Sequence, residues 1–182
     1  MSDAFDAAIA DLLGVEGDFS DDPADSGGAT RYGITEAVAR RHGYQGAMRE
    51  LPLAVAQDIY RADYWDAQNL DTIALHSPRI AWELFDTGVN MGTGRAGEYL
   101  QRSLNALNRR AIDYPDLEVD AAIGPATLDA LAAYLVRRGK DGETVLLRAL
   151  NALQGAAYIE LAERREKDER FVFGWFLQRV KL

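Results

Sequence analysis

The pattern of hydrophobic and polar positions is helical along most of the chain, with one long polar interruption near its start. Apolar side chains recur there at the spacing of one helical face: Phe5, Ile9, Leu12 and Leu13. This pattern predicts an amphipathic helix over residues 3–16. Continuing the apolar stripe by one turn leads to Glu16, so a carboxylate is expected on the core-facing side of the last turn, where Gly17 would end the helix.

The same periodicity predicts helices for most of the remaining chain. Their expected ranges are 35–42, 52–64, 78–89, 96–107, a helix starting at 125, 143–169 and 171–180. Prolines at positions 78 and 125 suit the first turn of a helix. Residues 66–77 and 108–123 are expected to be connectors, and no β-strand is predicted. The fold class is therefore all-α.

The polar segment 17–34 is rich in aspartate and glycine and is longer than most loops. Segments of this kind tend to carry function on a rigid scaffold. At the end of the preceding helix, both burial and the helix dipole disfavour a charged Glu16. Both effects favour the protonated carboxyl, which is the form that a general acid needs. The alternative is an ordinary helix-end Glu16 that leans into solvent.

The composition of the chain excludes several functions and several kinds of site. The chain of 182 residues has a formal charge of -9, which argues against nucleic-acid binding, because that function needs a basic surface. It has no cysteine, which excludes disulfides, thiol nucleophiles and Cys-bound zinc. No stretch of eighteen apolar residues occurs, so no membrane insertion is expected. The N-terminus lacks the pattern of a signal peptide, so synthesis in the cytoplasm without export by that route is expected.

A carboxylate mechanism is what the remaining side chains support. The two histidines, His42 and His76, lack metal-like partner spacing and are interpreted as surface or hydrogen-bonded residues. No metal or cofactor is implied. Hydrolysis of a glycosidic bond needs an acid for the leaving oxygen and a base or held water on the opposite face. Glu16 suits the acid; Asp25 or Asp22 could position the water, and Thr30 could hydrogen-bond it.

Aromatic and amide side chains supply candidate ligand contacts. Tyr60, Tyr64 and Trp65 lie on or near one helical face, which is typical of a core and also of a wall on which sugar rings stack. Asn90 lies in a glycine-rich segment, 88–94, whose simpler interpretation is a tight turn between helices.

Four sequence motifs resemble those of a known family. Residues 16–35 resemble the N-terminal signature of glycoside hydrolase family 108, which begins E-G-G-Y and continues N-D-P-A-D-P-G-G-A-T-N-F-G-I-T. The family comprises N-acetylmuramidases found as phage endolysins and as bacterial secretion activator proteins. Residues 59–66 and 85–92 are similar to its Y-x-x-x-Y-W-D and F-D-x-x-V-N-x-G tracts. Residues 120–128 resemble the D-G-x-I-G-P-x-T opening of a peptidoglycan-binding-like C-terminal region.

The resemblance implies a lysozyme-like catalytic region at residues 1–107, with a long polar active-site loop after the first helix. A peptidoglycan-binding-like helical region at residues 108–182 would pack on it. The implied activity is hydrolysis of the β-1,4 bond between N-acetylmuramic acid and N-acetylglucosamine in peptidoglycan glycan strands. The implied catalytic residues are Glu16 as general acid, with Asp25 and Thr30 placing the water. The candidate substrate contacts are Asp22, Tyr32, Tyr64, Trp65 and Asn90.

Two departures from the family pattern keep other functions open. Asp18 and Phe19 replace the second glycine and the tyrosine of E-G-G-Y, and Thr30 falls one residue short of its spacing in phage lysozymes. A lytic transglycosylase would need only one acid/base carboxylate, and an inactive peptidoglycan-binding or secretion-associated protein would need none.

The protein is expected to be a monomer that reaches the cell wall after holin-dependent release, or as part of a phage particle.

Overall fold

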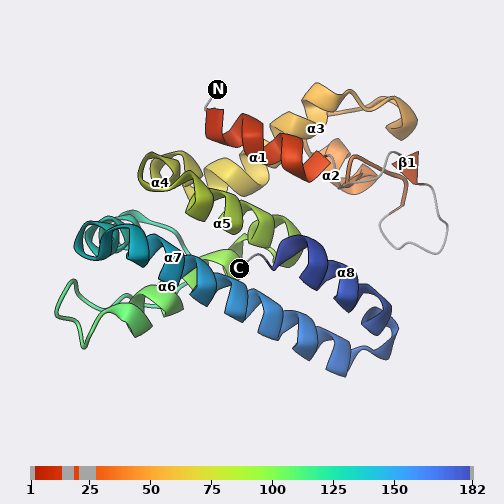
Figure 1. Ribbon diagram of the computed structural model, residues 1–182. Coiled ribbons are helices and arrows are strands. Elements are labelled where there is room, and N and C mark those ends of the chain that lie inside the picture. Colours follow the sequence, from red (N-terminus) through yellow and green to blue (C-terminus); the bar gives the residue numbers. More distant parts are fainter. Residues whose placement is uncertain (1–2, 14–18, 21–27, 181–182) are drawn as a thin grey trace. The chain divides into compact units, whose positions relative to one another are not determined.

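The computed structural model describes residues 3–13, 19–20 and 28–180, most of which are helical (Figure 1). The predicted all-α, lysozyme-like fold class is confirmed. The chain divides into two compact units, Met1–Ala67 and Gln68–Leu182. Among the described residues, no helix combines the length and apolar character that crossing a membrane requires.

The first unit is built from short elements. In chain order these are α1 (Asp3–Leu13), β1 (Phe19–Ser20), β2 (Thr30–Arg31), β3 (Ile34–Thr35), α2 (Glu36–Arg41), the 3-10 turn η1 (Met48–Glu50), α3 (Leu53–Tyr60) and the π-helical turn η2 (Arg61–Trp65). The unit ends within a second 3-10 turn, η3 (Asp66–Gln68). Thr35 caps the start of α2, since its hydroxyl accepts a hydrogen bond from the Val38 amide.

The predicted apolar stripe of α1 forms part of this unit's core. Phe5, Ile9 and Leu12 are buried, as the 3.6-residue period requires. The edge of the Phe5 ring meets the Trp65 ring, with 5.4 Å between centroids. The stripe therefore ties α1 to the end of the π-helical turn.

The expectation that the chain contains no β-strand is wrong. The three two-residue strands form one antiparallel sheet in the order β1-β2-β3. Strands of two residues are too short to produce a period-2 hydrophobic pattern, so periodicity could not reveal them. The pairing of β2 with β3 is specified instead by the turn between them.

The second unit is built from longer helices: α4 (Leu70–His76), α5 (Pro78–Met91), α6 (Thr93–Leu107), α7 (Pro125–Arg164), the 3-10 turn η4 (Glu166–Asp168) and α8 (Glu169–Arg179). Helix α4 lies where a connector was expected. It buries only Leu70 and Ile73, too few positions for a helical period to be recognised. Pro78 begins α5 as predicted, with the Ser77 hydroxyl as its N-cap.

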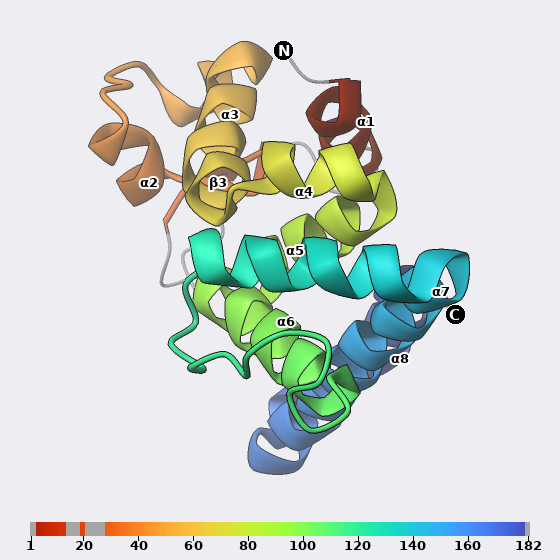
Figure 2. The ribbon, with the colours of Figure 1, turned by 90° about the vertical axis from the view of Figure 1, so that its left-hand side faces the viewer.

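Helix α7 packs on α5 and α6, and α8 packs on α7. Figure 2 shows the first half of α7 lying across α5 and α6, and Figure 1 shows α8 folding back along the second half of α7. The two helices predicted from residue 125 onward correspond to the two halves of α7, which meet at a kink where Gly139 departs from helical geometry (φ 59°, ψ -146°). Glycine reaches this left-handed φ without the steric penalty that a Cβ would cause.

Candidate functional site

The region that carries the predicted site residues is organised around the β2–β3 hairpin. Tyr32 and Gly33 connect the strands with φ values of 51° and 73°. Two consecutive positive φ angles define the type I′ turn, whose twist matches that of a two-residue hairpin. Thr30 pairs with Thr35 across the hairpin, so its position is fixed by the strand register.

Strand β1 closes the polar loop. Phe19 pairs with Arg31 and Ser20 pairs with Thr30, so the two ends of segment 21–29 are held together by the sheet. Thr30 therefore lies at the base of the loop, where its hydroxyl donates a 3.2 Å hydrogen bond to the Gly28 carbonyl.

Three of the predicted site residues lie outside the described part of the chain. These are the general acid Glu16, the water-positioning Asp25 and the substrate contact Asp22. Their roles stay predictions. In sequence, Asp22 and Asp25 belong to the segment that the β1–β2 pairing closes.

Tyr32 sits at the tip of the hairpin, where two neighbours anchor it. Its carbonyl accepts a 3.0 Å hydrogen bond from the Tyr60 hydroxyl of α3. The Arg31 guanidinium lies 4.9 Å from the centre of the Tyr32 ring and donates to its hydroxyl over 3.3 Å. Arg31 also donates to the carbonyl of Arg49. The hydrophobic pattern gave no signal for Arg31; its only mark in the sequence is its place between Thr30 and Tyr32 in the motif.

Tyr64 adds a second partly exposed aromatic ring beside Tyr60. The two ring centres are 5.7 Å apart, and Tyr64 belongs to the π-helical turn, a feature that often occurs at functional sites. Burial raises the pKa of the Tyr64 hydroxyl; the charge of Asp63 raises it further and Arg41 lowers it. The hydroxyl is therefore protonated at neutral pH and available as a hydrogen-bond donor. Tyr32 and Tyr64 thus share one neighbour, Tyr60.

Trp65 differs from Tyr64 because none of its surface is exposed. Its indole packs against Phe5, which fits the core interpretation of this aromatic set. Its predicted contact with substrate gains no support from this position.

The histidine of the first unit contacts a carboxylate that it shares with an arginine. His42 and Arg41 both approach the Asp63 carboxylate, each at 3.0 Å. This agrees with the interpretation of His42 as a hydrogen-bonded residue. Across residues 3–13, 19–20 and 28–180, no three His, Asp or Glu side chains are grouped so as to hold a metal ion.

Asn90 belongs to the second unit, in the last turn of α5. Its amide donates a 2.7 Å hydrogen bond to the Asp86 carbonyl. Helix α5 continues to Met91, two residues beyond the predicted end at residue 89. Gly88 leaves room for the Gln68 side chain, because a Cβ at position 88 would lie 2.4 Å from the Gln68 amide nitrogen. Asn90 is exposed, and its predicted contact with substrate stays a prediction.

The aspartates of the third and fourth motifs have partners within the second unit. Asp86 accepts hydrogen bonds from Arg179 of α8 at 2.8 Å and from Gln154 of α7 at 3.1 Å. Asp120 accepts one from the buried Gln101 at 2.7 Å, and this bond is the main reason that the pKa of Asp120 is lowered. Both motifs therefore stabilise the helical packing.

Comparisons with known proteins agree with the motifs. Residues 9–92 match the family described as glycosyl hydrolase 108, and residues 95–180 match the family described as predicted peptidoglycan domain. A comparison with curated proteins gives no match. Among solved structures, the chain is similar to that of SagA from Brucella abortus. The sequences are 25% identical, the TM-score is 0.61, and the alignment covers 98% of this chain and 96% of that one.

The two family matches follow one another along the chain and together account for nearly all of it. The first contains the polar loop, the hairpin and the tyrosine cluster formed by Tyr32, Tyr60 and Tyr64; the second contains α7 and α8. The predicted boundary between regions, at residues 107 and 108, stays a prediction. Residues 9–92 therefore belong to the glycosyl hydrolase 108 family and residues 95–180 to the predicted peptidoglycan domain family, which places the protein among the glycoside hydrolases that act on peptidoglycan.

Proposed function

We propose that this protein is an N-acetylmuramidase that hydrolyses the β-1,4 bond between N-acetylmuramic acid and N-acetylglucosamine. One observation carries the proposal: the hydrolase family match over residues 9–92 includes Glu16 and the entire polar loop. A region of the peptidoglycan family follows directly at residues 95–180. A hydrolase region and a peptidoglycan region in one chain are consistent with an enzyme that cleaves peptidoglycan.

In the proposed mechanism, Glu16 protonates the leaving glycosidic oxygen. Asp25 accepts a proton from a water molecule on the opposite face of the sugar, and Thr30 helps to hold that water. The position of Thr30 supports this role, because the sheet fixes it at the base of the loop. Its hydroxyl proton is directed to Gly28, so its oxygen can still accept a hydrogen bond from water.

Substrate contacts would come from the aromatic side chains beside the hairpin. Tyr32 and Tyr64 are partly exposed, and aromatic faces pack well against the apolar faces of sugar rings. Asp22 and Asn90 are further proposed contacts. Trp65 would contribute from the core, by fixing the turn that carries Tyr64.

The proposed setting is that of an endolysin-type enzyme. It would be made in the cytoplasm, reach the wall as a monomer after holin-dependent release or with a phage particle, and cause lysis there. The reaction as proposed uses two side-chain carboxyls and the Thr30 hydroxyl and needs no cofactor.

The test is product analysis after digestion of purified peptidoglycan. The wild-type protein should release muropeptides with a reducing N-acetylmuramic acid end, identified by mass spectrometry. Glu16→Gln should lower the rate by about 100- to 10,000-fold, the range over which general acids contribute. Asp11→Asn, which neutralises an exposed carboxylate on α1, is the matched control and should retain full activity.

Two results would replace the proposal. Products ending in a 1,6-anhydro sugar would identify a lytic transglycosylase, and Asp25→Asn would then have little effect. Binding to peptidoglycan without any product, by the wild type and the Glu16→Gln variant alike, would identify an inactive wall-binding protein.

A further inference from the structure

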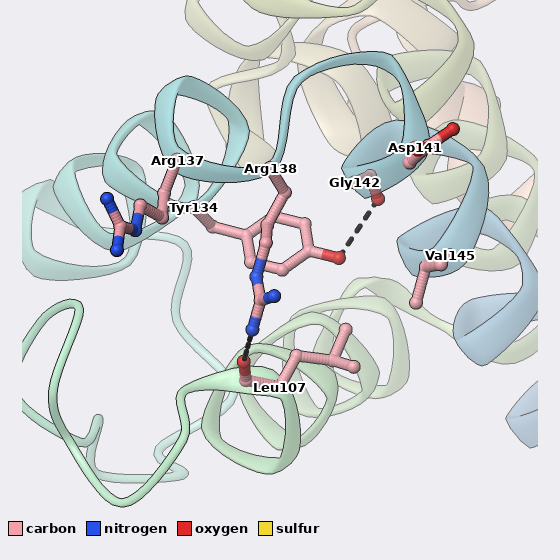
Figure 3. Close-up of a pocket in the computed structure, with 7 residues that line it drawn as sticks. All are labelled: Leu107, Tyr134, Arg137, Arg138, Asp141, Gly142 and Val145. Atoms are coloured by element: carbon pink, nitrogen blue, oxygen red, sulfur yellow. Dashed lines mark hydrogen bonds between the residues drawn. The ribbon is translucent and has the colours of Figure 1, made fainter.

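A pocket lies within the second unit at the kink of α7 (Figure 3). It has a volume of about 410 Å³ and lies between the end of α6 and the two halves of α7. Leu107, Tyr134, Arg138 and Val145 contribute its walls. None of the residues that line it belongs to the four motifs or to the tyrosine cluster.

Two glycines make this pocket possible. Gly139 adopts the left-handed φ that breaks α7, and Gly142 allows the halves to come close, since a Cβ at that position would lie 2.3 Å from Cβ of Arg138. The Tyr134 hydroxyl then donates a 3.0 Å hydrogen bond to the Gly142 carbonyl across the break. The kink is therefore a fixed feature, and the pocket is formed before any ligand binds.

The walls combine an apolar interior with the guanidinium groups of Arg137 and Arg138. Figure 3 shows the side chains of Leu107 and Val145 directed into the same space beside the Tyr134 ring, while Arg138 extends past that ring toward the Leu107 carbonyl. The contacts of Arg138 are long: 3.4 Å to this carbonyl and 4.0 Å to the Asp113 carboxylate. Its guanidinium therefore keeps donor capacity for a closer partner.

The electrostatics of the pocket favour an anion. Three guanidinium groups, those of Arg109, Arg137 and Arg138, share the single carboxylate of Asp113. Arg109 makes the close contact, with 3.0 Å between its Nε and an Asp113 oxygen. The three guanidinium groups outnumber the carboxylates of Asp113 and Asp141, which lies at the pocket's edge. The pocket is therefore locally positive, although the chain as a whole has a formal charge of -9.

We infer that this pocket binds the peptide stems of peptidoglycan by a free carboxylate next to a small apolar side chain, as at a D-alanine terminus. Arg138 would take the carboxylate, because a guanidinium matches two carboxylate oxygens. The methyl group would lie between Leu107 and Val145. The inference rests on the proposed function only in taking peptidoglycan as the polymer, and it assigns the peptide to this pocket and the glycan to the hydrolase region.

The test is a titration of the ¹⁵N-labelled full chain with a soluble stem pentapeptide ending in D-alanyl-D-alanine. Amide signals of residues 138–145 should shift. The same peptide with an amidated C-terminus should bind about tenfold more weakly, as expected for the loss of a charge-assisted hydrogen bond. Arg138→Gln and Val145→Glu should each weaken binding of the acid form by about tenfold. Arg148→Gln removes an exposed charge from the same helix and should change nothing.

Hydrolysis of peptide-free glycan strands separates this inference from the proposed function. The wild type and Arg138→Gln should cleave such strands equally. Absence of peptide-induced shifts at millimolar concentration, or equal binding of the acid and amide peptides, would overturn the pocket assignment even if the enzyme is active. Shifts at the pocket caused by peptide-free glycan would overturn it as well. Peptide binding by a protein without hydrolase activity would leave the pocket assignment in place and remove the proposed reaction.

Discussion

The two compact units differ in charge and in how their parts are held together. The first, Met1–Ala67, has five basic and thirteen acidic residues, a formal charge of -8, whereas the second, Gln68–Leu182, has fifteen and sixteen, a formal charge of -1. Nearly all of the chain's net negative charge thus lies in the unit that carries the proposed catalytic residues. Such charge would oppose long-range approach to an anionic wall at low ionic strength. The nearly neutral second unit is the better suited to make first contact.

The two units also differ in how their irregular segments are held in place. In the first unit the tip of the hairpin depends on individual side-chain contacts, chiefly those that Tyr60 and Arg31 make to Tyr32. In the second unit, three side-chain amides hold the connector 109–124 at successive points: those of Gln101 and Asn105 on α6, and that of Asn108, the residue that follows α6. Each amide both donates to and accepts from the connector, which satisfies its backbone without regular structure.

This contrast predicts different responses to substitution. Because the contacts of the second unit are close and reinforce one another, a change there should lower the free energy of unfolding most. Because the hairpin is held by single hydrogen bonds, a change in the first unit should alter activity more than stability.

The largest effect is expected from Gly97→Ala in α6. A Cβ at this position would lie 2.1 Å from the Ala121 carbonyl oxygen. The Gln101 side chain holds the backbone on both sides of this atom, since it accepts a hydrogen bond from the Ala121 amide and donates one to the Ala122 carbonyl. The connector must therefore shift, and the free energy of unfolding should fall by about 3 kcal/mol. Urea denaturation followed by circular dichroism measures the change.

Gly94→Ala in the first turn of the same helix is the matched control. The nearest atom to its added Cβ would be the Ala121 Cβ at 3.9 Å, an ordinary contact. It should stabilise the protein by about 0.5 kcal/mol, since alanine favours helix. Equal effects of the two substitutions would show that the connector is not held rigidly against α6.

Much of this fold could be predicted from the sequence, because long helices produce a clear apolar period. The stripe of α1, the start of α5 at Pro78 and the start of α7 at Pro125 are all confirmed. The missed elements, α4 and the sheet, are short and depend on tertiary contacts. Buried positions are too few in such elements for a period to appear.

The site was predicted less completely, and for a physical reason. Residues 16–35 could be identified by motif, yet the hairpin that fixes Thr30 follows from the positive φ angles of Tyr32 and Gly33. A tyrosine in that conformation gives no compositional signal. The pairing of Tyr60 with Tyr32 joins positions 28 residues apart, and no local pattern reveals such a contact.

The next effect in size is expected from Tyr60→Phe in the first unit. The substitution removes the hydrogen bond to the Tyr32 carbonyl and keeps the buried ring. Stability should fall by about 1 kcal/mol, the usual contribution of one hydrogen bond. Hydrolysis of peptidoglycan should slow by more than this loss of folded protein explains, because the hairpin tip would be less well placed.

Tyr44→Phe is the control, since it removes a hydroxyl that donates to the Ala47 carbonyl on the exposed side of the unit. It should leave the turnover rate unchanged. If Tyr60→Phe also preserved the rate, the hairpin tip would have no part in catalysis, and the expected difference between the units would be lost.

The smallest effect is expected from Asp113→Asn, and it should depend on pH. Hydrogen bonding to Arg109 lowers the pKa of Asp113, opposed by partial burial and aided by the charges of Arg109, Arg137 and Arg138. A carboxyl whose folded-state pKa is depressed stabilises the protein above its unfolded pKa of about 3.9, and this contribution is lost as pH falls through the lower, folded-state value. Asp113→Asn should therefore be less stable than the wild type at pH 7, and the difference should shrink below about pH 4.

Denaturation curves from pH 7 down to about pH 3 measure this difference. Asp129→Asn, an exposed substitution on α7, is the control and should show no such trend. A difference that stays constant with pH would mean that Asp113 acts through shape and not through its charge, and the arginines around the pocket would then not depend on it for neutralisation.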